Sequence, residues 1–272
     1  MPFQLPYTTL AQMAVFLLIF FRMTGVIISA PLFTNKAFPM VLRVWFSFFV
    51  ALMCFPLAYS ASDPVALLKS LEHPYNATLI VLSELCIGWA IGFVSSFMMW
   101  TFQLAGHLIS QEVGLNMGQV FDPMTETSGS PLTTFFTTSS LLVFVCLGGH
   151  RLVLLSVARS VELLPLGRPF WNPDLQDFLT LRVAGEMWTQ GLQTAMPVVV
   201  SLSLVTISMA ILARSVPEMN VFILGFSIRL SLGLFAVLAV LGNVHDILFS
   251  MYKTGFQFTG DLLLLMGEHS GG

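Results

Sequence analysis

Charged residues are scarce in this chain. Asp, Glu, Lys and Arg make up 9% of its 272 residues, whereas ordinary soluble domains carry about 25%. The surface of a soluble protein of this length cannot be built from so few charges. Because 56% of the residues are hydrophobic, a disordered chain is excluded as well. A membrane protein is the class that remains.

An excess of basic residues is also missing, and cysteines are few. The formal net charge is −3, which argues against a nucleic-acid partner. The three cysteines, Cys54, Cys86 and Cys146, lie in apolar runs, and their spacing matches no metal or disulfide pattern. We interpret them as small hydrophobic residues.

The N-terminal segment lacks the features of a cleaved signal peptide. No Lys or Arg precedes the first apolar run, and no convincing small-x-small cleavage site follows it. We therefore expect this first segment to stay in the mature protein.

Long apolar segments recur along nearly the whole chain. We predict six of them, with a proline interrupting the second and a short seventh run near the C-terminus, at about residues 10–29, 40–59, 79–109, 132–147, 197–212, 221–241 and 255–266. A helix over 79–109 would reach about 45 Å at 1.5 Å per residue. That exceeds the roughly 30 Å hydrocarbon core of a bilayer, so the third segment must tilt, bend or protrude.

Several charges interrupt these apolar segments. A charge at a bilayer centre costs on the order of 2.5–3.5 kcal/mol, so it is normally kept for a function or a partner. Arg22, Glu84 and Arg229 are expected to pair with one another or with charges on neighbouring subunits. Arg214 and Glu218 lie four residues apart with Pro217 between them, which predicts a kink or helix–helix corner held by an ion pair.

Motifs for chemistry are absent, and motifs for packing are present. We find no catalytic, cofactor-binding or metal-binding pattern in the sequence, and so do not expect an enzyme. Gly88 and Gly92 form a Gly-x-x-x-Gly pattern, which allows another helix backbone to approach closely. Between residues 110 and 130, repeated glycines and prolines make a continuous helix improbable.

The order of motifs along the chain resembles the FliR family of flagellar biosynthesis proteins, part of the type III export gate. The matching motifs are Arg22 with Ala30-Pro31-Leu32-Phe33; Glu84 with Ile87-Gly88 and Gly92-Phe93; Gly106, Gly114, Asp122-Pro123 and Pro131-Leu132; Phe144 with Gly149-His150; Ser160 with Leu164-Pro165-Leu166-Gly167; and Arg214 with Pro217-Glu218-Met219-Asn220-Val221-Phe222. The last of these is the most specific. Met219 stands where we expect leucine, a mild departure from the family pattern.

The resemblance implies an all-α, membrane-associated bundle of long kinked helical hairpins, assembled into a helical multi-subunit export gate. It implies one FliR-like domain over 1–272, with a FliP-like part at about 1–196 and a FliQ-like hairpin part at about 197–272. The implied partners are the gate subunits FliP and FliQ, the export components FlhB and FlhA, unfolded flagellar substrates and membrane lipid. The implied location is the flagellar basal body in the bacterial inner membrane.

The resemblance also implies a loop that plugs the export channel. By position, the plug is expected at about residues 111–123. Its predicted residues are Gln111, Gly114, Leu115, Met117, Gly118, Val120, Phe121 and Pro123. A simple connecting turn between two hairpins is the alternative reading of this segment.

Other functions remain open from the sequence. A virulence-type (injectisome) export gate subunit is the near alternative, although such proteins tend to carry a more charged central loop. A secondary transporter with broken helices and charges near the membrane midplane is the more distant one.

Overall fold

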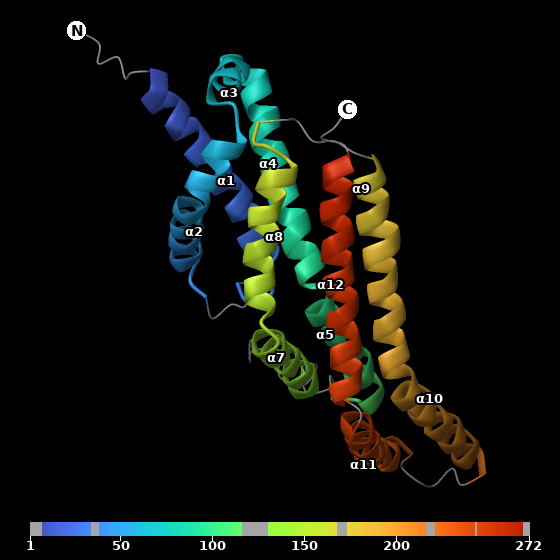
Figure 1. The fold of residues 1–272 in the computed structure, drawn as a ribbon. Helices are drawn as coiled ribbons and strands as arrows, with labels where there is room; N and C mark the ends of the chain where they lie inside the picture. Colours follow the sequence, from blue (N-terminus) through green and yellow to red (C-terminus); the bar gives the residue numbers. More distant parts are fainter. Residues whose placement is uncertain are drawn as a thin grey trace. The chain divides into compact units, whose positions relative to one another are not determined.

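All regular elements of the described structure are helices (Figure 1). The computed structural model describes residues 7–33, 38–115, 130–167, 173–215, 221–242 and 244–268. The helices are α1 (Tyr7–Ser29), α2 (Met40–Ala61), α3 (Pro64–Leu71), α4 (Pro74–Ser95), α5 (Phe97–Val113), α7 (Pro131–Cys146), α8 (Gly149–Leu163), α9 (Pro173–Asp177), the π-helix η1 (Phe178–Ala184), α10 (Gly185–Ser215), α11 (Val221–Gly242) and α12 (Val244–Glu268). The predicted all-α membrane bundle is confirmed.

Several helices are long and apolar enough to cross a membrane. Four stretches qualify on their own, namely Thr9–Ser29, Met40–Ala61, Pro74–Ser95 and Pro173–Ser215. The count rises to six if α7 with α8, and Leu224–Val240 of α11 with α12, each form one interrupted span. By length and composition, the chain is a membrane protein.

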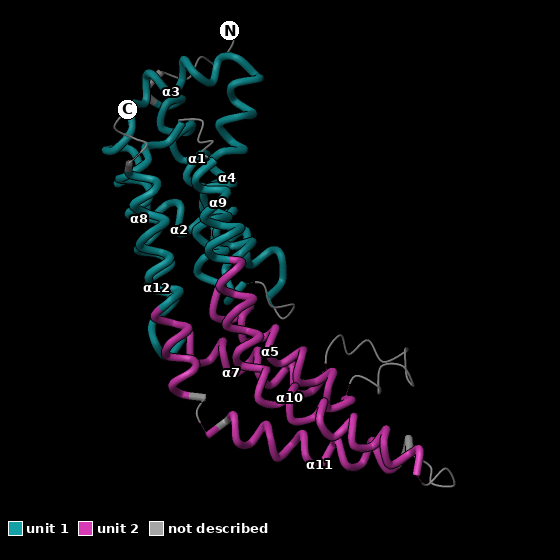
Figure 2. The backbone as a smooth tube through the Cα atoms, turned by 90° about the vertical axis from the view of Figure 1, so that its right-hand side faces the viewer, with its two compact units in different colours: residues 1–96, 145–183, 254–272 teal, residues 97–144, 184–253 magenta. Residues whose placement is uncertain are grey.

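The chain forms two compact units (Figure 2). Unit 1 comprises Met1–Ser96, Val145–Val183 and Thr254–Gly272, and unit 2 comprises Phe97–Phe144 and Ala184–Lys253. The predicted boundary at about residue 196 separates a FliP-like part from a FliQ-like part. It is based on resemblance to those two proteins and not on compactness, so the two units do not test it. It stays a prediction, and α10 runs through that position without a break.

Unit 1 is organised around α1. This helix packs most extensively on α4 and also contacts α2 and α3, while α8 contacts α2 and α4. Fully buried side chains such as Ile19 of α1 and Ile91 of α4 form its apolar core. Helix α3 begins where the Asp63 side chain accepts hydrogen bonds from the backbone N–H groups of Val65 and Ala66, at 3.2 and 3.4 Å.

Unit 2 is built on the pairing of α5 with α10. Helix α11 packs against both. The Phe102 ring of α5 meets the Phe136 ring of α7 with centroids 4.9 Å apart. A Cβ atom at Gly191 of α10 would lie 2.8 Å from the Leu104 side chain of α5, so the lack of a side chain here favours the close approach of the two helices.

The structure differs from the predicted segments at three places. Pro56 does not interrupt α2 but lies inside it, as prolines can in membrane helices. The long third segment is divided at Ser96 into two helices, α4 and α5. The short run at 255–266 belongs to a 25-residue helix, α12, whose first half was too polar to be recognised from hydropathy.

Candidate functional site

A buried ion pair lies at the centre of unit 1. The Arg22 Nε atom on α1 donates to Glu84 Oε2 on α4 at 2.6 Å, and both side chains are 0% exposed. The two terminal nitrogens of Arg22 donate to Ser160 Oγ at 3.2 Å and to the Leu164 carbonyl at 3.1 Å. Every nitrogen of the guanidinium group therefore has a partner inside the chain.

The Glu84 carboxylate is satisfied in the same way. Its second oxygen, Oε1, accepts the backbone N–H of Gly167 at 3.1 Å. Gly167 has φ +88°, and a Cβ atom there would also lie 2.8 Å from the Leu67 side chain, so glycine is strongly favoured at this position. The cluster of Arg22, Glu84, Ser160, Leu164 and Gly167, here called the Arg22 centre, thus joins α1, α4, the end of α8 and the turn after it.

Small residues allow α1 and α4 to approach closely enough for this pairing. A Cβ atom at Gly88 would overlap the Arg22 carbonyl oxygen, and one at Gly92 would lie 2.5 Å from the Val26 carbonyl oxygen. Ser29 Oγ of α1 donates to the Trp89 carbonyl of α4 at 2.9 Å. The predicted packing glycines, Gly88 and Gly92, therefore both lie in the α1–α4 contact.

From the sequence, Arg22 and Glu84 could pair either with each other or with charges on neighbouring subunits. Arg22 and Glu84 pair with each other within this chain rather than with a neighbouring subunit. Since the hydrogen bonds described above all lie within the chain and both side chains are buried, this pair holds helices together and offers no open position to a substrate.

The other predicted charges lie elsewhere. Arg214 is exposed in the last turn of α10, where a cation is favourable at the helix C-terminus. Its expected partner, Glu218, lies outside the described residues, so the proposed corner pair stays a prediction. Arg229 lies in α11 of unit 2 and is half-buried.

The start of the predicted plug coincides with the end of α5. Gln111 is in the last turn of α5, and Gly114, with φ +86°, follows the helix. The Gly114 N–H donates to the Gln111 carbonyl at 3.1 Å, and the Leu115 N–H donates to the Ser110 carbonyl at 3.2 Å. This pair of bonds is a Schellman motif with glycine in its left-handed position. The remaining plug residues, Met117, Gly118, Val120, Phe121 and Pro123, lie outside the described residues.

Sequence reasoning missed part of the Arg22 centre. Ser160 and the Leu164–Gly167 turn were noted only as family motifs, without a structural role. Gly25 was not singled out, although a Cβ atom there would overlap the Leu85 carbonyl of α4. Its position three residues after Arg22, on the face of α1 that holds Arg22, Val26 and Ser29, is the signal that could have identified it.

The described residues contain no group of three or more His, Cys, Asp or Glu side chains that could hold a metal ion. The Arg22 centre itself is a saturated ion pair, which stabilises and positions helices.

The sequence matches the family described as bacterial export proteins, family 1, over residues 13–254. The chain belongs to this family. The resemblance to FliR proteins is thereby confirmed, and with it the assignment to a family of flagellar export components.

Curated relatives align over most of their length. The flagellar biosynthetic protein FliR of Bacillus subtilis is 27% identical over 254 residues, which cover 93% of this chain and 95% of the relative. FliR of Aquifex aeolicus is 29% identical, covering 82% of this chain and 83% of the relative. The surface presentation of antigens protein SpaR of Shigella flexneri is 26% identical, covering 84% and 85%.

Proposed function

We propose that this chain is a core subunit of the flagellar type III export gate. In this proposal it forms, with FliP and FliQ, the channel through which unfolded flagellar subunits cross the inner membrane at the flagellar basal body. The observation that carries it is the family match over residues 13–254, combined with an alignment to a flagellar relative over more than nine-tenths of both chains. FlhB and FlhA are the further export components with which it would work.

The apolar surface of the chain supports assembly with other membrane subunits. Large hydrophobic side chains are exposed along α2, for example Met53 at 81% and Trp45 at 55%. Along α10 they include Ile211 at 65%. Such surface must be covered by lipid or by protein. By contrast, the Arg22 centre is complete within the chain, so the helices of unit 1 are held together before any partner binds.

The role of the 111–123 loop follows from the same proposal. Gly114 ends α5 with a defined left-handed turn, so the loop begins at a fixed point. Its apolar residues would close a narrow pore to water and ions, as hydrophobic constrictions do, and weak contacts would yield to an arriving polypeptide.

Co-purification tests this function. An affinity-tagged copy of the full chain, expressed with its chromosomal neighbours, should purify in mild detergent with FliP and FliQ and should restore motility to a strain that lacks its own FliR. A monodisperse, long-lived lone monomer would contradict the proposal and favour the transporter alternative.

The injectisome alternative has one specific observation in its favour, the similarity to SpaR of Shigella flexneri. The two systems are distinguished by complementation. Rescue of flagellar motility without rescue of injectisome secretion is the expected result, and the reverse pattern would assign the chain to a virulence system.

A further inference from the structure

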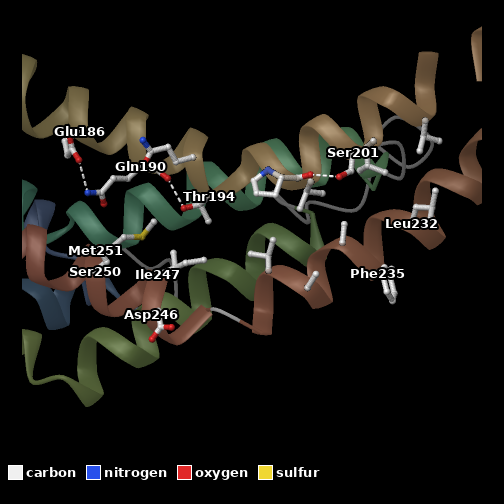
Figure 3. Close-up of a pocket in the computed structure, with 18 residues that line it drawn as sticks. Glu186, Gln190, Thr194, Ser201, Leu232, Phe235, Asp246, Ile247, Ser250 and Met251 are labelled. Carbon is white, nitrogen blue, oxygen red and sulfur yellow. Dashed lines mark hydrogen bonds between the residues drawn. The ribbon is translucent and has the colours of Figure 1, made fainter. Parts of the chain in front are cut away.

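Helix α12 has different surroundings along its length. Its first turns line an open groove of about 900 Å³ in unit 2, together with α10 and α11 (Figure 3). The α12 side chains at this groove are Asp246, Ile247, Ser250 and Met251. From Thr254 onward the helix belongs to unit 1. The contacts that hold this C-terminal half of α12 are therefore contacts within unit 1.

The C-terminal half of α12 is buried along one apolar stripe. Phe258, Leu262 and Met266 follow one another at every fourth position, and they are 6%, 0% and 0% exposed. Residues four apart lie on the same face of a helix. Apolar burial is favourable but not directional, and methionine adapts to irregular spaces. The stripe thus holds the helix in unit 1, but it controls the position of the helix along its axis less than directed polar contacts do.

A directed contact to this half of α12 comes from η1. Arg182 Nη2 lies 3.0 Å from Asp261 Oδ2, and Arg182 Cζ lies 5.7 and 5.8 Å from the ring centroids of Phe178 and Phe258. The two rings meet edge to face with centroids 6.0 Å apart. A guanidinium group within about 6 Å of a ring centroid is attracted to the ring. We call these four residues the Arg182 clasp.

The Arg182 clasp is much more open than the Arg22 centre. The side chains of Arg182 and Asp261 are 61% and 35% exposed, whereas those of Arg22 and Glu84 are 0% exposed. An exposed ion pair contributes little stability and is screened by salt, because water solvates both groups when they separate. Unit 1 therefore contains one ion pair that stays closed and one that opens at low cost.

The element that carries Arg182 is itself adaptable. Helix η1 is a seven-residue π-helix, a rare form that occurs mostly as single turns and frequently at functional sites. A π-turn holds one residue more than an α-turn, so a return to α-helical geometry would turn Phe178 and Arg182 about the helix axis relative to each other. Such a turn would take at least one of them away from Phe258 and Asp261. A change of register in η1 would therefore open the clasp.

We propose that the Arg182 clasp is a releasable latch: it sets the position of the C-terminal half of α12 against η1, and this half moves when the latch opens. The inference goes beyond the proposed function and does not depend on it, because every group involved belongs to unit 1 of this chain. The family match ends at residue 254, before Phe258 and Asp261, so family membership does not give this contact.

Distance measurements between spin labels test the latch. The full chain is purified with any subunits that accompany it, after Cys54, Cys86 and Cys146 have been replaced. Labels are placed at Leu181 of η1 and Leu264 of α12, which are 74% and 67% exposed. The chain with an intact clasp should give one main distance. Arg182→Gln and Asp261→Asn should each move about half of the molecules or more to a second, resolved distance, because the directed contact that favours the first state is lost.

Two controls separate the latch from general loosening. Arg151→Gln removes an exposed arginine of α8 and should leave the distance between the labels at Leu181 and Leu264 unchanged. A second label pair, at Leu82 of α4 and Leu155 of α8, is 54% and 58% exposed. It reports on the part of unit 1 held by the Arg22 centre and should give the same distance in every variant.

Two results would overturn the proposal. If Arg182→Gln and Asp261→Asn keep the original distance between the labels at Leu181 and Leu264, the clasp does not set the position of α12. If the distance between Leu82 and Leu155 changes as much as the first distance does, the variants loosen all of unit 1 and the clasp is not a latch. Neither result bears on the proposed function, which co-purification and complementation test separately.

Discussion

Arg22 on α1 and Glu84 on α4 are 62 residues apart in sequence and form an ion pair of 2.6 Å with both side chains fully buried. Burying two charges is costly, and the attraction between them offsets that cost only when the remaining hydrogen-bonding groups are also satisfied. Here Ser160, Leu164 and Gly167 supply those bonds. The pair therefore fixes the positions of three helices and one turn relative to one another.

Breaking this pair from one side should destabilise unit 1 strongly. Glu84→Ala leaves the Arg22 guanidinium buried without a counter-charge, at a cost of about 3–5 kcal/mol. We expect a large loss of folded protein in membranes and a lower unfolding temperature of the purified complex, measured by fluorescence-detected size exclusion across a temperature series.

Two variants control for this effect. Glu72→Ala removes an exposed carboxylate just after α3 and should leave stability within about 0.5 kcal/mol of the wild type. The double variant Arg22→Met with Glu84→Leu removes both charges and should recover part of the loss, because no uncompensated charge remains. A double variant no better than Glu84→Ala alone would show that the pair is not the cause.

Gly88→Ala should separate α1 from α4. The added methyl group would overlap the Arg22 backbone carbonyl, and backbone cannot move aside as a side chain can. The expected cost is at least the 1–3 kcal/mol typical of overpacking, seen as a lower unfolding temperature. Gly260→Ala, in a helix with open space around the new methyl group, should be neutral or stabilising by up to about 1 kcal/mol. Equal losses in both would argue against close packing as the reason for Gly88.

Most of the helices could be predicted from the sequence because a segment in lipid must satisfy its own backbone hydrogen bonds. Apolar segments long enough to span a bilayer must be helical, and five of the predicted segments coincide with α1, α2, α7, α11 and the later part of α10. The first half of α12 has no such pattern. Its polar residues, such as His245 and Asp246, interrupt the apolar pattern, so hydropathy does not identify the helix there.

The Arg22 centre could be predicted only in part. Buried charges in apolar runs predict that partners exist, and Arg22 and Glu84 were identified on that ground. Which partner each takes depends on how α1 and α4 pack, and hydropathy contains no information on this. The acceptors at Ser160 and Leu164 come from α8 and its C-terminal end, about 140 residues after Arg22, so only the fold brings them together.

The left-handed turn at Gly114 should tolerate asparagine better than alanine. Space is not limiting, since a Cβ atom there would lie 3.6 Å from the Phe226 ring. The strain comes from φ +86°, which costs roughly 1–2 kcal/mol for most residues and less for asparagine. Gly114→Ala should therefore speed hydrogen exchange of the amides of residues 114 and 115 more than Gly114→Asn does. Equal exchange in both variants would contradict the role of the left-handed turn.

Deleting Gly114 to Gly118 should open the channel without preventing assembly. The deletion removes the glycine that ends α5 and part of the apolar surface of the predicted plug, including Leu115 and Met117, while the Arg22 centre in unit 1 is untouched. A pore that has lost its hydrophobic constriction conducts ions. We expect wild-type amounts of complex, higher ion leakage across the membrane and slower growth, measured by membrane-potential dyes and by conductance in planar bilayers. Gly114→Asn keeps the loop length and should stay at wild-type conductance, which separates loss of the plug from a change in the turn. If the deletion assembles fully and conductance does not rise, the segment is a connecting turn and the plug assignment is wrong.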